Sequence, residues 1–257
     1  MQNLSVTLVQ TTQQWENKAG NLTHFDDLFA QLPATDLVLL PEMFHTGFSM
    51  NAEALAETMN AAGIAWLKKM AREKDTAIYT SLIVKEDDHF YNRGVFVQPD
   101  GIVHVYNKQK RFAMAGEDLV YSAGEKPTIV HWKGWKINLQ ICYDLRFPEI
   151  VRNALNEDGK AAYDVILYVA NWPERRALHW KSLLVARAIE NQCYVAGLNR
   201  VGTDGNGLTY SGDSMVVDAL GTVHGCEASV EEIKTVELNY TDLMTVRQQL
   251  PFLKDGL

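Results

Sequence analysis

The chain has 257 residues, of which 47% are hydrophobic and 22% are charged, as expected for a globular protein with a large core. Its formal net charge of −8, with no basic run, argues against nucleic acid or an anionic membrane as a partner. No apolar run approaches the ~20 residues of a membrane-spanning helix, and the N-terminus lacks the basic segment of a signal peptide.

The hydrophobic pattern predicts strands that alternate with helices along the whole chain. In the first half, strands are predicted at 4–10, 36–40, 77–84, 91–97 and 102–106, and helices at 18–32 and 63–74. In the second half, strands are predicted at 137–141, 164–170, 194–198, 214–217, 222–224 and 232–238, and helices at 148–155, 176–191 and 240–250. Between the halves, residues 109–126 form a long irregular segment, which is often functional in a compact domain. The glycine-rich stretch 202–207 is predicted to be a flexible loop.

Two stretches of the first half resemble stretches of the second half. Residues 36–42 and 164–172 are both buried strands that end in polar residues, and residues 97–104 and 217–224 both contain a turn at glycine. This weak repeat suggests two similar βα layers that pack on each other. Because no linker or shift of composition divides the chain, we expect one domain over residues 1–257.

The three cysteines, Cys142, Cys193 and Cys226, lie far apart in the sequence. An odd number at such wide spacing matches neither a disulfide framework nor a zinc-binding pattern. Together with the missing signal peptide, this favours a protein of the reducing cytoplasm.

Three polar residues, Glu42, Lys108 and Cys142, end predicted strands, a position that commonly lines a site in α/β folds. A partly desolvated glutamate suits a general base. A lysine can stabilise negative charge that develops on a carbonyl oxygen, and a cysteine can attack a carbon electrophile. The three together would form an acyl-transfer site without histidine.

Cys142 is predicted to precede a sharp turn and a helix that begins at Pro148, so helix amides would favour its thiolate form. Simpler interpretations remain open at this point. The cysteine could be a buried structural residue. Glu42 could be an ordinary surface carboxylate, and the basic cluster at 108–111 could be a solvated loop.

Four motifs resemble, in the same order, the signatures of the carbon–nitrogen hydrolase (nitrilase) superfamily: LLPEMF at 39–44, YNK at 106–108, ICYDLRFPE at 141–149 and ARAIEN at 186–191. The family's Glu-Lys-Cys triad corresponds to Glu42, Lys108 and Cys142, and a further family glutamate corresponds to Glu117. The resemblance implies an α/β fold of the four-layer α-β-β-α sandwich type, without a metal or organic cofactor. It also implies a homodimer or higher homo-oligomer, with the C-terminal segment 240–257 at the interface.

The resemblance further implies a mechanism. Glu42 takes the thiol proton as Cys142 attacks an amide carbonyl, and Lys108 with the backbone N–H of Tyr143 holds the oxyanion. Ammonia leaves, and water then hydrolyses the thioester. Glu117 orients Lys108 and helps to position the substrate nitrogen.

After the lysine, the sequence departs from the commoner family pattern and reads QKRFAMAGED at 109–118. This run and NWPERR at 171–176 resemble bacterial omega-amidases, which hydrolyse the terminal amide of 2-oxoglutaramate and 2-oxosuccinamate to the dicarboxylate and ammonia. We therefore predict an amidase for a small-molecule amide. The alternatives are carbamoyl-amide or nitrile hydrolysis within the superfamily, and a non-catalytic binding protein on the same fold.

The carboxylate of such a substrate requires a cation, and arginine offers a bidentate fork. Arg146 and Arg175 are the candidates, although Arg146 could instead brace the cysteine turn through an ion pair with Glu149 or another acid. Phe112 and Trp172 could wall the pocket, or they could belong to the core.

Overall fold

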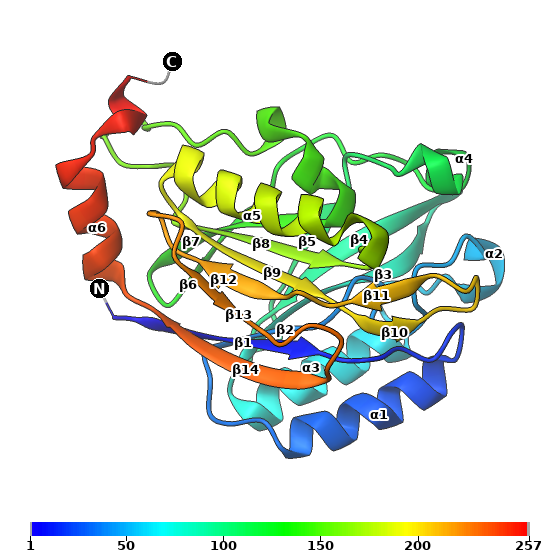
Figure 1. The fold of residues 1–257 in the computed structure, drawn as a ribbon. Coiled ribbons are helices and arrows are strands. Elements are labelled where there is room, and N and C mark those ends of the chain that lie inside the picture. Colours follow the sequence, from blue (N-terminus) through cyan, green and yellow to red (C-terminus); the bar gives the residue numbers. More distant parts are fainter. Residues whose placement is uncertain (1, 256–257) are drawn as a thin grey trace.

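Two six-stranded β-sheets lie face to face at the centre of the computed structural model, which describes residues 2–255 (Figure 1). The strands of the first sheet are β1 (Leu4–Gln10), β2 (Leu37–Leu39), β3 (Ala77–Glu86), β4 (His89–Val97), β5 (Val103–Asn107) and β14 (Glu232–Leu238). Those of the second sheet are β6 (Ile129–Trp132), β7 (Trp135–Ile141), β8 (Val165–Ala170), β9 (Tyr194–Asn199), β12 (Met215–Val217) and β13 (Val223–Gly225). Residues 1, 256 and 257, which end the predicted domain and the predicted interface segment, lie outside the described residues.

The two sheets have the same strand arrangement. In the first sheet, β1, β2 and β3 are parallel, and antiparallel neighbours complete the order β14-β1-β2-β3-β4-β5. In the second sheet, β7, β8 and β9 are parallel, and the order is β6-β7-β8-β9-β12-β13. The similar stretches 36–42 and 164–172 contain β2 and β8, which occupy equivalent positions. The predicted pair of similar layers is therefore confirmed.

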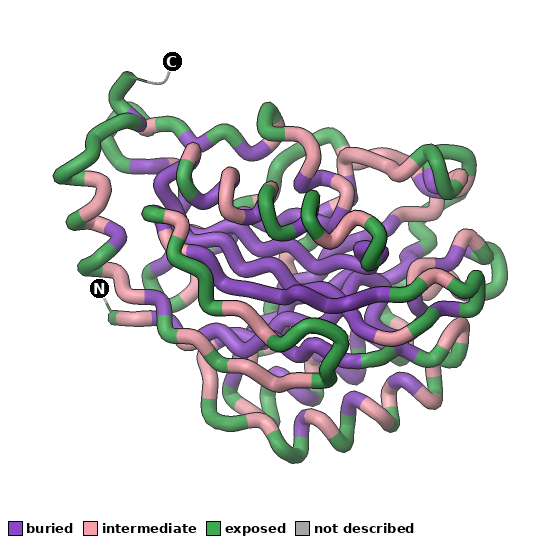
Figure 2. The backbone as a smooth tube through the Cα atoms, in the orientation of Figure 1, coloured by how far each residue is buried: buried purple, intermediate pink, exposed green. Residues whose placement is uncertain are grey.

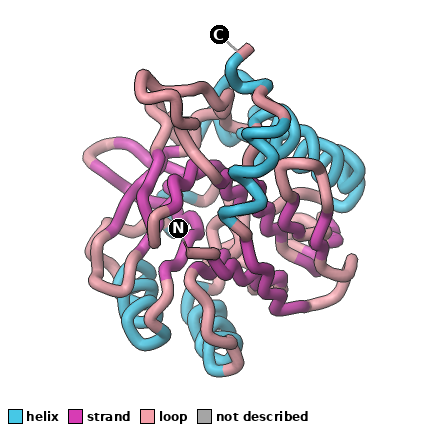
Figure 3. Tube along the Cα trace, turned by 90° about the vertical axis from the view of Figure 1, so that its left-hand side faces the viewer, coloured by secondary structure: helices cyan, strands magenta, loops and turns pink. Residues whose placement is uncertain are grey.

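Helices cover the outer faces of both sheets and complete the predicted four-layer α-β-β-α sandwich (Figure 3). On the first sheet lie α1 (Lys18–Ala30) and α3 (Ala62–Lys74), of which α3 contacts β3 and β4. On the second sheet lies α5 (Ala177–Asn191), which contacts β9 and β12. The last helix is α6 (Tyr240–Gln249). No helix in residues 2–255 combines the length and the apolarity that crossing a membrane requires.

The main hydrophobic core lies between the two sheets and beneath α5. Both halves of the chain contribute fully buried side chains to it, for example Leu8 and Leu39 from the first sheet and Leu139 and Leu167 from the second. Figure 2 shows these buried strands inside an outer shell of more exposed helices. Every residue of β2 and β8 is buried, as their continuous apolar runs predict. The shared core supports one domain, which stays a prediction.

The prediction of a helix at 148–155 is wrong. The chain forms two short 3₁₀ turns, Cys142–Arg146 and Pro148–Ile150, and then runs without a helix up to β8. Asn153 explains the difference, because its backbone N–H donates to the side chain of Asn191 (2.8 Å) and its side-chain amide donates to the Asn191 carbonyl (3.0 Å). These long-range hydrogen bonds take the place of the helical ones.

In the glycine-rich stretch 202–207, the predicted loop covers residues 204–207, which connect β10 (Val201–Thr203) to β11 (Thr209–Ser211) in a hairpin, whereas residues 202 and 203 belong to β10. The Asp204 carboxylate accepts hydrogen bonds from the backbone N–H groups of Asn206 (2.8 Å) and Leu208 (2.9 Å), which fixes the connection between these strands. The sequence also did not predict β6 or the short helices α2 (Ala52–Leu55) and α4 (Glu117–Val120).

Candidate active site

Polar side chains that end three strands come together at one end of the sandwich. Glu42 follows β2 and Lys108 follows β5 in the first sheet, whereas Cys142 follows β7 in the second. All three are buried, with exposed fractions of 0%, 2% and 8%. Because the site lies where the two sheets face each other, its residues are close in space although they are distant in the sequence.

Lys108 lies between two buried carboxylates. Its Nζ donates to Oε1 of Glu42 (3.0 Å) and to both carboxylate oxygens of Glu117 (2.9 and 3.0 Å). Burial alone disfavours a charged lysine, but the negative charges of Glu117 and Glu42 outweigh it and hold the pKa of Lys108 well above its usual range. The lysine is therefore a fixed positive charge in the wall of the site.

Glu42 accepts hydrogen bonds from both sheets. The Asn92 side chain in β4 donates to Oε1 (2.7 Å), and the backbone N–H of Asn171, just after β8, donates to Oε2 (2.9 Å). The same Asn92 amide also donates to Oε1 of Glu117 (3.2 Å), so that one side chain orients both carboxylates. With Lys108, these donors fix the orientation of Glu42.

Cys142 has a strained backbone conformation at the turn after β7. Its φ of +44° lies in the left-handed region, which residues other than glycine rarely adopt. The thiol lines a cavity, and its Sγ is 3.9 Å from the carbonyl oxygen of Asn171. Burial, followed by the negative charge of Glu42, raises the pKa of the thiol well above its usual value, although Lys108 opposes the shift. The expectation of a thiolate favoured by helix amides is therefore wrong for the resting protein.

Glu117 begins the short helix α4 within the irregular segment that follows Lys108. It is fully buried and accepts a hydrogen bond from the backbone N–H of Phe112 (2.5 Å). Further along, the backbone N–H of Gly124 donates to the Lys108 carbonyl (2.9 Å). A Cβ at Gly124 would lie 1.9 Å from the carbonyl oxygen of the residue before the lysine, so only glycine fits there. These contacts hold the segment against the site.

A third buried carboxylate, Asp144, connects the cysteine turn to the lysine segment. It accepts hydrogen bonds from the backbone N–H groups of Ile141 (3.0 Å) and Lys110 (2.9 Å) and from the Tyr106 hydroxyl (2.9 Å). Burial raises the pKa of Asp144 to about 7, although Lys108 and these donors oppose the shift. The carboxylate thereby sets the position of the cysteine turn relative to the lysine.

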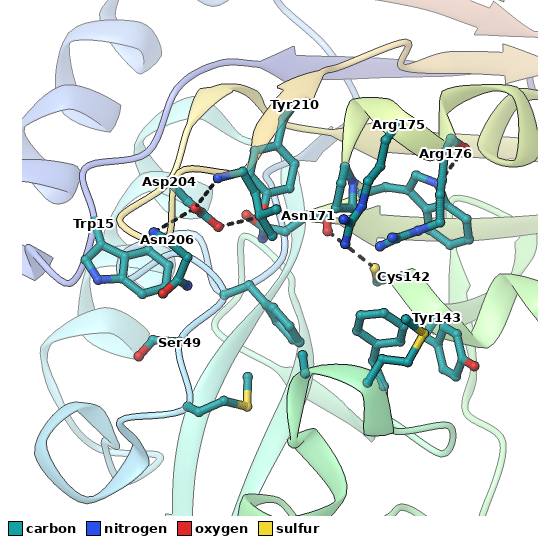
Figure 4. A pocket seen from close by; sticks show the side chains of 18 of the residues that line it. Trp15, Ser49, Cys142, Tyr143, Asn171, Arg175, Arg176, Asp204, Asn206 and Tyr210 are labelled. Atoms are coloured by element: carbon teal, nitrogen blue, oxygen red, sulfur yellow. Dashed lines mark hydrogen bonds between the residues drawn. The ribbon is translucent and has the colours of Figure 1, made fainter.

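The cavity beside the thiol has a volume of about 460 Å³, a usual size for a small-molecule site (Figure 4). The predicted site residues that line it are Lys108, Phe112, Cys142, Tyr143, Arg146, Trp172 and Arg175. Glu42 and Glu117 do not line the cavity and are bound to Lys108, which does. The structure thus brings all predicted site residues to one place, while their roles stay predictions.

Arg146 does not brace the cysteine turn through Glu149. Its guanidinium stacks over the ring of Trp172, 4.6 Å from the ring centre, and one of its nitrogens lies 3.3 Å from Nδ1 of His179. Glu149 instead forms an ion pair with Lys110 (3.1 Å). Trp172 is buried and also lines the cavity, so the two predicted positions, in the core and in the pocket wall, are both correct for this residue.

Sequence reasoning missed four polar residues of the site, which are Asn92, Asp144, Asn171 and Arg176. Asn171 and Arg176 stand in the run at 171–176 that carried the subfamily resemblance, and Asp144 stands in the cysteine motif. These positions could have been proposed from the sequence. Asn92 has no such signal, because it lies in the interior of β4.

Iodoacetamide is expected to alkylate Cys142 at least about 10-fold faster than Cys193 and Cys226. The reagent carries a primary amide and can enter the cavity beside Cys142, where Glu42 can take the thiol proton. By contrast, neither Cys193, which is fully buried, nor Cys226, whose pKa burial raises to about 12, lines this cavity beside Glu42 and Lys108. Peptide mass spectrometry after timed exposure measures the three rates. Equal rates at the three thiols would contradict an activated cysteine at the cavity.

Known proteins share both the sequence pattern and the structure. The pattern of the carbon-nitrogen hydrolase family matches residues 5–248. An omega-amidase YafV from Yersinia enterocolitica is 44% identical over 258 aligned residues, which cover 99% of this chain and 97% of the relative. A 2-oxoglutaramate amidase from Bacillus subtilis (strain 168) is 34% identical, over 86% of this chain and 84% of the relative.

Among solved structures, XC1258 from Xanthomonas campestris superimposes with a TM-score of 0.96 and is 41% identical, over 100% of this chain and 98% of that chain. It is described as a CN-hydrolase superfamily protein with an arsenic adduct in its active site. The close superposition confirms the fold that the sequence resemblance implied.

Proposed function

This chain belongs to the carbon-nitrogen hydrolase family, and from that membership we propose that it is an omega-amidase for small omega-amido keto acids. The amidase relatives identify it more generally as an amide-hydrolysing enzyme. The proposed substrates are 2-oxoglutaramate and 2-oxosuccinamate, and the products are the dicarboxylate and ammonia. The names of the two relatives support this choice, since one is an omega-amidase and the other a 2-oxoglutaramate amidase.

The observation that carries the proposal is the position of Lys108. Its ammonium lies between Glu42 and Glu117 and lines the same cavity as the Cys142 thiol. Such a site contains a nucleophile, a base and a fixed positive charge, which are the groups that acyl transfer requires. This arrangement supports a catalytic role for the Glu-Lys-Cys triad.

In the acylation step, Glu42 accepts the thiol proton as Sγ of Cys142 forms a bond to the amide carbon. The raised pKa of the thiol makes this base necessary. Lys108 and the backbone N–H of Tyr143 stabilise the negative charge that develops on the carbonyl oxygen. Glu42 then passes its proton to the nitrogen, the carbon–nitrogen bond breaks, and ammonia leaves a thioester on the cysteine.

In the deacylation step, water attacks the thioester carbon and gives a proton to Glu42. The sulfur–carbon bond breaks, the carboxylic acid product forms, and the proton returns to the thiolate of Cys142. Glu117 takes no part in these transfers. It keeps Lys108 in place through two hydrogen bonds, so that the ammonium faces the oxyanion in both steps.

The first test is ammonia release from 2-oxoglutaramate, measured beside glutamine, an N-carbamoyl amino acid and a simple nitrile. We expect kcat/KM for the keto-amide to exceed that for each of the other three by at least about 10²-fold. Glutamine carries an ammonium, the carbamoyl compound has a urea carbonyl in place of a carboxamide, and the nitrile has no carboxylate. Activity on the carbamoyl compound or the nitrile, without activity on the keto-amide, would keep the triad and reject the omega-amidase proposal.

A further inference from the structure

Three arginines line the cavity, which are Arg146, Arg175 and Arg176. Within residues 2–255, none of them forms an ion pair with an aspartate or a glutamate. Figure 4 shows Arg175 and Arg176 on the Cys142 side of the cavity, whereas Asp204 lies toward the opposite side. The cavity therefore has a cationic side next to the thiol, and the part of the chain that the structure describes provides no carboxylate for it.

The cavity's own acids are already engaged elsewhere. Glu16 accepts a hydrogen bond from the Ser49 hydroxyl (2.5 Å). Asp204 accepts hydrogen bonds from two backbone N–H groups of the hairpin connection and from the Tyr210 hydroxyl (2.7 Å). Among residues 2–255, no acid of the cavity is left to balance the arginines, and a substrate carboxylate can supply this charge.

The three arginines differ in how far they are already committed. Arg146 stacks on Trp172 and contacts His179, so part of its guanidinium is in use. Arg175 is exposed, and water can solvate its charge fully. Arg176 is half-buried, and in the described part of the chain its guanidinium has no hydrogen-bond acceptor. Its guanidinium lies over the ring of Phe112, 5.3 Å from the ring centre.

The backbone of Arg176 is fixed, so its side chain starts from a defined point. Its N–H donates to the Pro173 carbonyl (2.9 Å), and its carbonyl accepts a hydrogen bond from the Trp172 indole (2.9 Å). The ring beneath its guanidinium belongs to Phe112, whose backbone N–H donates a hydrogen bond to the Glu117 carboxylate. Phe112 therefore contacts both the Arg176 guanidinium and the Glu117 carboxylate that holds Lys108.

The surroundings of Arg176 disfavour its positive charge when no anion is bound. Burial, followed by the positive charges of Arg175 and Arg146, lowers the pKa of the Arg176 guanidinium. A bound carboxylate would supply the missing counter-charge and accept two parallel N–H···O hydrogen bonds. An ammonium at the same place would add a fourth positive charge to the cluster.

We propose that Arg176 is the specificity-determining residue of the site, in that its fork binds the carboxylate of an omega-amido acid and disfavours amides that carry a 2-ammonium group. This inference rests on the proposed function, because it deepens the substrate choice of the same cavity. It assigns the carboxylate to Arg176 and not to the adjacent Arg175. It also explains how a single site separates a 2-oxo acid amide from the corresponding 2-amino acid amide, which differs in charge by one unit.

The test compares Arg176→Gln with Arg175→Gln on four amides of matched chain length. They are 2-oxoglutaramate, 4-carbamoylbutanoate (a carboxylate without the oxo group), glutamine (a carboxylate with an ammonium) and pentanamide (neutral). For Arg176→Gln we expect kcat/KM to fall about 10- to 100-fold on the first two, mainly through KM, and less than about 3-fold on pentanamide. The ratio of keto-amide to glutamine activity is expected to fall as well.

Two variants serve as controls. Arg175→Gln is the comparison variant, and we expect its loss of kcat/KM on the two carboxylate amides to be at least about 5-fold smaller than that of Arg176→Gln, since an exposed arginine contributes little. Arg176→Lys keeps the charge but loses the fork, and it is expected to recover part of the carboxylate selectivity. An equal loss on pentanamide and 2-oxoglutaramate would show that Arg176 is only structural. A larger loss of kcat/KM on the carboxylate amides in Arg175→Gln than in Arg176→Gln would also overturn the inference.

A second measurement does not depend on turnover of the keto-amide. 2-Oxoglutarate is expected to protect Cys142 from iodoacetamide in the wild-type protein, and about 10-fold more of it is expected to be needed in Arg176→Gln. If the wild type fails to hydrolyse 2-oxoglutaramate but shows this protection, the proposed function fails and the carboxylate subsite stands. Equal protection of both proteins, or of neither, would overturn the subsite.

Discussion

Replacing Cys142 with alanine is expected to abolish ammonia release, with a loss in kcat of at least about 10⁴-fold. Among the described residues that line the cavity, Cys142 is the only cysteine, and no other group there can form the thioester. The fold is expected to remain, because alanine keeps the Cβ at a φ of +44° and the lost Sγ makes one weak contact of 3.9 Å. Steady-state kinetics and thermal unfolding of the same preparation measure both effects.

Cys193→Ala is the matched control for this variant. Cys193 is fully buried in the core and does not line the cavity, so its replacement is expected to lower stability while kcat stays within about 2-fold of the wild type. If Cys142→Ala kept near wild-type turnover, the nucleophile would have to be assigned elsewhere. A loss of activity in both variants would point to a general effect of cysteine removal on folding.

Replacing Lys108 with methionine is expected to remove activity and to lower the free energy of unfolding by about 3–5 kcal/mol. Methionine fills most of the space of the lysine stem, but it leaves the fully buried carboxylates of Glu42 and Glu117 without their shared cation. Two uncompensated carboxylates in a buried site are costly. Urea titration measures the stability, and ammonia release measures the activity.

The double variant Lys108→Met/Glu117→Gln separates the two roles of the lysine. Glutamine keeps the size of Glu117 and an acceptor for the Phe112 N–H, but it removes one buried charge. We expect it to restore about 2 kcal/mol of the stability without restoring activity. Lys110→Met, at the neighbouring half-buried lysine whose ion pair with Glu149 lies at the surface, is expected to stay close to the wild type in both assays. If Lys108→Met were as stable as the wild type, the expectation that Lys108 compensates the buried charges of Glu42 and Glu117 would be contradicted.

The sequence by itself determined the fold class, and it placed three candidate site residues at strand ends. Strand positions follow from local apolar patterns. A strand that is buried on one face has an apolar residue at every second position, and a strand that is buried on both faces has a continuous apolar run. Glu42, Lys108 and Cys142 were found because each stands in a short contiguous motif at a strand end. The likeness of residues 36–42 to 164–172 likewise predicted the two equivalent sheets.

Only the tertiary structure decided which groups surround Glu42, Lys108 and Cys142. Asn92 comes from a strand interior and Asn171 from the other sheet, yet both bind Glu42. The raised pKa of the Cys142 thiol depends on the same packing, whereas its local sequence suggested the opposite. Arg175 and Arg176 are neighbours in the sequence, but one faces solvent and the other lies over an aromatic ring. Burial and hydrogen-bond partners arise from contacts between distant segments, so a local pattern does not contain them.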